Sequence, residues 1–75
     1  MSNYGEVIFT DMQMDEPRYL CLRENGELYI CTVVKDKDKF FESNVCDITE
    51  QEAMIFVAAA TRKAMGAIKT KEIQR

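Results

Sequence analysis

The chain has no histidine and no tryptophan, and it holds only one proline and three glycines among its 75 residues. Without histidine it lacks the commonest general acid–base group and the usual partner of a serine or cysteine nucleophile. The glycines, Gly5, Gly26 and Gly66, are too scattered to form a phosphate-binding loop. We therefore expect a protein that is not an enzyme, with no catalytic residues and no cofactor.

Cysteine occurs three times, and its spacing indicates no disulfide framework. Cys21, Cys31 and Cys46 are an odd number and contain no C-x-x-C pair. A zinc site would have to use cysteines and carboxylates alone, because there is no histidine. We expect no metal site, and we expect the thiols to be buried or half-buried as small hydrophobic groups.

The longest regular pattern predicts one helix over residues 50–71. Thr49 and Glu52 have the spacing of a capping box at its start. Gly66 lies inside the pattern, and we expect the helix to continue through it because the apolar stripe resumes at Ile68. The stripe consists of Ala53, Val57, Ala60, Ala64 and Ile68, with Met54, Phe56 and Met65 on its flanks.

The same helix carries small or apolar residues on a second face. Ile55, Ala59 and Gly66 point roughly away from the stripe, where a helix covered on one side only should be polar. Either another chain buries part of this face, or the residues are a tolerated scatter on a solvent-facing surface.

Four segments before the helix are typical of short β-strands, at about 6–12, 18–24, 27–35 and 39–44. In the first of them, loose alternation places Val7 and Phe9 on one side and Ile8 on the other. We predict a single α+β domain over residues 1–75. It is an antiparallel β-meander of three to four strands packed against one long C-terminal α-helix.

Asn25 and Gly26 separate the second and third segments and predict a two-residue type I′ hairpin turn. That turn would pair Cys21 with Ile30 and would place Cys21 and Cys31 on opposite faces of the sheet. Both faces would then be apolar, which favours a helix on one face and a second chain on part of the other. The pattern leaves open which face meets the helix.

The net charge of −3 is unevenly distributed. Residues 1–60 hold five basic and twelve acidic residues, a balance of −7, whereas residues 61–75 hold five basic and one acidic, a balance of +4. The first residues show neither the basic region nor the apolar core of a signal peptide. The apolar run at 53–60 is too short to span a bilayer. We expect a cytoplasmic protein with no membrane contact.

These features favour a small binding or regulatory protein that acts through protein–protein interaction. We expect a homodimer with an additional protein partner, in the manner of an inhibitor or accessory protein of bacterial or phage origin. Tyrosine, arginine and methionine are enriched at interfaces, and small residues allow helices to approach closely. The candidate interaction residues are Arg18, Tyr19, Arg23, Tyr29, Ile55, Ala59, Arg62 and Gly66.

Two other functions stay open. An oligomer could sequester a small anion or nucleotide if Arg18, Arg23 or Arg62 met across a symmetric interface. The basic end of the helix could instead contact nucleic acid, although the acidic body and the lack of an aromatic platform argue against it. The basic residues in question are Arg62, Lys63, Lys69, Lys71 and Arg75.

Overall fold

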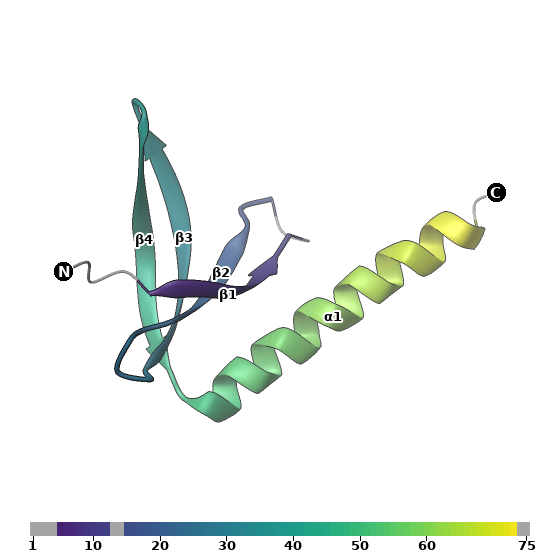
Figure 1. The fold of residues 1–75 in the computed structure, drawn as a ribbon. Coiled ribbons are helices and arrows are strands. Elements are labelled where there is room, and N and C mark those ends of the chain that lie inside the picture. Colours follow the sequence, from purple (N-terminus) through teal and green to yellow (C-terminus); the bar gives the residue numbers. More distant parts are fainter. Residues whose placement is uncertain (1–4, 13–14, 74–75) are drawn as a thin grey trace.

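The computed structural model describes residues 5–12 and 15–73. It contains one four-stranded antiparallel sheet in the order β1-β2-β3-β4, followed by a single helix, α1 (Figure 1). The predicted α+β meander with a long C-terminal helix is confirmed. The elements are β1 (Glu6–Asp11), β2 (Arg18–Leu22), β3 (Leu28–Asp36), β4 (Lys39–Ile48) and α1 (Glu50–Ile73).

The capping box at the start of α1 forms as predicted. The Glu52 amide donates to the hydroxyl oxygen of Thr49 at 3.1 Å, and the Thr49 amide donates to Oε1 of Glu52 at 3.0 Å. The hydrogen bond from the Thr49 amide holds the pKa of the Glu52 carboxyl below its usual value, and the Thr49 side chain lowers it further. The helix also continues through Gly66, as predicted.

The β2–β3 hairpin has a three-residue loop, so the predicted two-residue turn is wrong. The Gly26 amide donates to the carbonyl oxygen of Arg23 at 3.0 Å, and the Arg23 amide donates to that of Glu27 at 2.8 Å. Gly26 has φ +89°, which glycine adopts without steric cost. This is a type I turn closed by a glycine bulge, a common connection one residue longer than type I′.

The longer loop shifts the strand pairing by one residue. Cys21 lies opposite Tyr29 rather than Ile30, and Tyr19 lies opposite Cys31. Because a one-residue shift reverses the face of every side chain in one strand relative to the other, Cys21 and Cys31 share a face. The prediction that they lie on opposite faces is therefore wrong.

Two β-bulges change the pattern further. In β1, Val7 pairs with Cys21 but Phe9 pairs with Leu20, so Ile8 is an extra residue. Val7 and Phe9 consequently lie on opposite faces, contrary to the prediction.

In β4, Asn44 has φ 54° and begins the second bulge. Its side-chain amide donates to the Thr32 hydroxyl at 3.1 Å. The strand therefore bends and continues to Ile48 instead of ending at Asn44. Since the bulge adds one residue, Glu42 and Asp47 lie on the same face.

The core is divided between the two faces of the sheet. On one face, Leu20 of β2 packs against Ala53 and Phe56 of α1. On the other face, Tyr29 and the two neighbouring cysteines form a second buried cluster. Figure 1 shows α1 running past the sheet toward its C-terminus. Partly buried residues complete the two clusters: Phe9, Leu28, Ile30, Ile48 and Val57 on the helix side, and Tyr19 on the other.

Candidate functional site

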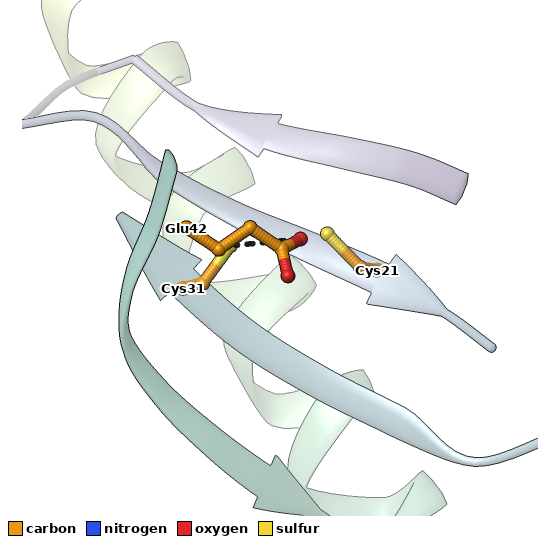
Figure 2. A group of neighbouring side chains, drawn as sticks. All are labelled: Cys21, Cys31 and Glu42. Carbon is orange, nitrogen blue, oxygen red and sulfur yellow. Dashed lines mark hydrogen bonds between the residues drawn. The ribbon is translucent and has the colours of Figure 1, made fainter. Parts of the chain in front are cut away.

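Three adjacent strands bring two thiols and a carboxylate together on the sheet face away from α1. Cys21 comes from β2, Cys31 from β3 and Glu42 from β4, and Figure 2 shows both thiols beside the Glu42 carboxylate. One ligand atom from each of the three residues lies within 4.8 Å of the others. Both cysteines are buried and Glu42 is half-buried. We call these three residues, together with Tyr29, the thiol cluster.

Hydrogen bonds connect the cluster through the Tyr29 hydroxyl. This group donates to Oε2 of Glu42 at 2.5 Å and accepts from the Gly5 amide at 2.7 Å. The Cys31 thiol donates to the same Glu42 oxygen at 3.7 Å. A Cβ atom on Gly5 would lie 2.6 Å from the carbonyl oxygen of Leu22, so this close approach requires glycine.

The surroundings raise the pKa values of two groups in the cluster, the Cys31 thiol and the Tyr29 hydroxyl. Burial, together with the neighbouring Cys21 and Glu42, raises the pKa of the Cys31 thiol to about 12. Burial and the hydrogen bond to Glu42 also raise the pKa of the Tyr29 hydroxyl. Without a cation, Cys31 is a neutral thiol and a poor nucleophile.

Arg23 lies beside Tyr29 of the thiol cluster and contacts two residues of its own chain. Its guanidinium carbon is 4.2 Å from the centre of the Tyr29 ring, and Nη1 is 2.8 Å from Oδ1 of Asp47. A guanidinium above an aromatic face is favourable because the ring face is electron-rich. Arg23 therefore closes one side of the cluster and contacts an acidic residue at the same time.

The other two candidate arginines lie elsewhere. Arg18 is 5.0 Å from the centre of the Phe56 ring, on the helix side, and Nη2 is 3.9 Å from the buried Asp11 carboxylate. On α1, Nε of Arg62 donates to the Ala58 carbonyl at 3.3 Å. Within one chain, the structure does not bring these arginines together into an anion site.

The remaining candidate interaction residues divide between core and surface. Tyr29 is fully buried and Tyr19 packs against it, so both belong to the thiol cluster region rather than to an open surface. On α1, Ile55 and Gly66 are exposed and Ala59 is half-buried. Lys69, Lys71 and Arg75, on which nucleic-acid binding would depend, lie outside the residues whose side chains are described.

A line of exposed residues follows α1 next to the buried stripe. It comprises positions 54, 58, 61, 65 and 68, which alternate in steps of four and three. Met54 is 67% exposed, Met65 49% and Ile68 50%, so these three residues of the predicted apolar stripe and its flanks lie outside the core. Among the described side chains of α1, the last buried one is Ala60 and the last half-buried one is Ala64. We call this line the α1 seam: Met54, Ala58, Thr61, Met65 and Ile68.

An apolar groove of about 440 Å³ runs along the first half of the seam, between α1 and the sheet. Met54 and Ala58 form one wall and Ile8 of β1 lies in the other. Sequence reasoning missed the seam because it adjoins the core stripe and resembles its flank. The lining residues are Ile8, Leu20, Leu28, Glu50, Ala53, Met54, Val57 and Ala58.

Over residues 5–12 and 15–73, no helix has the length and apolarity needed to cross a membrane. Comparisons of the chain with family models, with curated proteins and with solved structures gave no match.

Proposed function

We propose that this chain is a small protein-binding module that works as a homodimer, with a second copy docked on the α1 seam. The observation that carries the proposal is the surface area of the single chain. The accessible surface is 6134 Å². A compact monomer of 8.7 kDa exposes about 4,700 Å².

The excess is large enough for a specific interface. It amounts to about 1,400 Å², whereas each partner of a standard interface contributes roughly 800 Å². The radius of gyration, 14.5 Å, also exceeds the value of about 11 Å for a compact chain of this length. The long helix accounts for much of this extension, because its 24 residues span about 36 Å.

The seam has the spacing expected of a helix that packs against another helix. In two supercoiled helices, steps of four and three residues keep a line of side chains on the side of each helix that faces its partner. The small side chain of Ala58 allows close approach, and the flexible Met54 and Met65 can adapt to an irregular partner. Two copies related by a twofold axis would each bury the same seam against the other.

The adjoining groove supports the same occupant. Its apolar lining begins where the seam does, so a helix on the seam can also place side chains in the groove. Covering both would remove Ile8 and Met54 from water, and this burial is the main driving force for association. The dimer would then present the rest of its surface to a further protein, which is the regulatory role that we infer.

Sedimentation equilibrium over a dilution series tests this proposal. Met65→Glu places a charge in the middle of the seam and should weaken the dimer at least tenfold. Ile55→Glu is the matched control, since it makes the same kind of change at an exposed apolar position off the seam, and it should leave the dimer intact. A wild-type monomer at tens of micromolar, or a dimer broken by Ile55→Glu and not by Met65→Glu, would contradict the proposal.

A further inference from the structure

We propose that Cys21, Cys31 and Glu42 form a binding site for a thiophilic divalent cation, and that Zn²⁺ is the ion that suits their donor atoms. Thiolate sulfur and carboxylate oxygen are both common zinc ligands, and two thiolates favour zinc over the harder Mg²⁺ and Ca²⁺. This inference is independent of the proposed dimer, because the thiol cluster and the α1 seam lie on different sides of the sheet.

The spacing of the donor atoms is close to that of a tetrahedral site. Zinc bonds of about 2.3 Å to sulfur and 2.0 Å to oxygen hold an S–O pair roughly 3.5 Å apart and an S–S pair roughly 3.8 Å apart. Sγ of Cys31 lies 3.7 Å from Oε2 of Glu42. Since all three donors lie within 4.8 Å of one another, a closure of roughly 1 Å would complete the set.

The local backbone directs these three side chains to one place. The three-residue hairpin loop puts Cys21 and Cys31 on the same face. Asp47 lies opposite Tyr29 on that face, and in a regular strand Glu42, five residues earlier, would point to the other face. The extra residue in the bulge that begins at Asn44 puts Glu42 on the same face as Asp47. Bulges commonly redirect a side chain toward a functional site.

The surroundings of Glu42 resemble those of an oriented metal ligand. Its carboxylate is half-buried and lies beside both thiols. The Tyr29 hydroxyl holds Oε2 at 2.5 Å and would orient the carboxylate, as groups behind metal ligands often do.

Binding would exchange protons for metal without redox chemistry. The two S–H bonds of Cys21 and Cys31 would be replaced by S–metal bonds, and both protons would pass to solvent. Three protein ligands leave one position of a tetrahedral ion for water. The alternative is that the thiols act only as small buried hydrophobic groups, and in that case the protein would bind no ion at this place.

Cobalt and zinc titrations of the full chain, refolded with a reductant, test the proposal. We expect one Co²⁺ per chain with a sulfur-to-cobalt charge-transfer absorption band, displaced by Zn²⁺. Cys46→Ser is the matched control, because Cys46 is exposed and lies opposite Ile30 on the other face. This variant should bind as the wild type does, whereas Cys21→Ser and Cys31→Ser should lose most of the band.

Glu42→Gln keeps the inference falsifiable if the cysteine variants fail to fold. The side chain is half-buried and nearly unchanged in shape, and circular dichroism checks the fold. We expect zinc affinity, measured by competition with a chromophoric chelator, to fall at least tenfold. Absence of one-to-one binding by the wild type, loss of binding in Cys46→Ser, or unchanged affinity in a folded Glu42→Gln would overturn the site.

Discussion

The Tyr29 hydroxyl lies 2.5 Å from Oε2 of Glu42, so a fully buried side chain of β3 is joined to a half-buried carboxylate of β4. The same hydroxyl accepts a hydrogen bond from the Gly5 amide at 2.7 Å. One phenolic oxygen thus connects the segment before β1 to the third and fourth strands. The face of the sheet away from α1 is held by polar contacts as well as by packing.

Tyr29→Phe should destabilise the protein by about 1–3 kcal/mol, because it leaves the Gly5 amide and the Glu42 carboxylate without their shared partner. Urea unfolding followed by circular dichroism measures this change. Tyr19→Phe is the control, since Tyr19 is only half-buried, and it should cost much less. Equal losses in the two variants would show that the hydroxyl of Tyr29 has no special role.

Two glycine-to-alanine substitutions should have opposite effects on the free energy of unfolding. Gly5→Ala places a Cβ atom 2.6 Å from the Leu22 carbonyl oxygen and should cost about 1–3 kcal/mol. A Cβ atom on Gly66, inside α1, would meet no atom within 4 Å apart from the neighbouring backbone of the helix itself. Gly66→Ala should therefore stabilise the protein by about 0.5–1 kcal/mol. Thermal melting of the two variants beside the wild type measures the sign of each change in stability. A stabilised Gly5→Ala would contradict the close packing at that position.

The start of α1 should show a defined pH dependence. The pKa of Glu52 is lowered in the folded chain from 4.5, because the charged form bonds to Thr49. The resulting stability is complete above the unfolded pKa and is lost as pH falls through the folded pKa. Urea midpoints of the wild type and Glu52→Gln should therefore differ most near neutral pH and converge below pH 4.5. A difference that does not vary with pH would refute the ionised capping box.

The three cysteines should react with iodoacetamide at different rates in the metal-free native protein. Cys46 is exposed and should be alkylated first, whereas Cys21 and Cys31 are buried. The raised pKa of the Cys31 thiol, about 12, further slows its reaction, because the thiolate is the nucleophile. Intact-mass spectrometry should show a single adduct that persists until urea is added. Rapid addition of three adducts without denaturant would mean that the buried cluster is open.

Features set by neighbouring residues could be predicted from the sequence. The helix follows from the apolar stripe, and its start follows from Thr49 and Glu52 three residues apart. The strands likewise follow from local composition and turn residues. These signals depend on residues within a few positions of one another, so they need no knowledge of the folded chain.

The faces of the sheet could not be predicted in the same way. Asn25-Gly26 suits a type I′ turn, but a glycine with positive φ also closes the three-residue loop that is present. Exchanging the two-residue turn for the three-residue loop moves every side chain of one strand of the hairpin to the other face relative to its partner strand. The extra residues at Ile8 and Asn44 add two further reversals that simple alternation does not reveal. The thiol cluster therefore became visible only in three dimensions.

The exposure of the α1 seam depends on how far the sheet extends along the helix. Met65 and Ile68 follow the apolar pattern of the core, and nothing local separates them from Ala60, which is buried. The same pattern buries Ala60 and half-buries Ala64, but it leaves Met65 and Ile68 exposed. A second copy on the seam would restore the burial that the pattern implies.

The most direct test of the account is an isotope-filtered NMR experiment on a mixture of labelled and unlabelled chains. It detects methyl contacts that occur only between two copies. We predict intermolecular contacts at the methyl groups of Met65 and Ile68, and none at the exposed Val34 of the β3–β4 hairpin. Contacts at Val34 alone, or none at any of these positions in a concentrated sample, would contradict a dimer formed through the α1 seam.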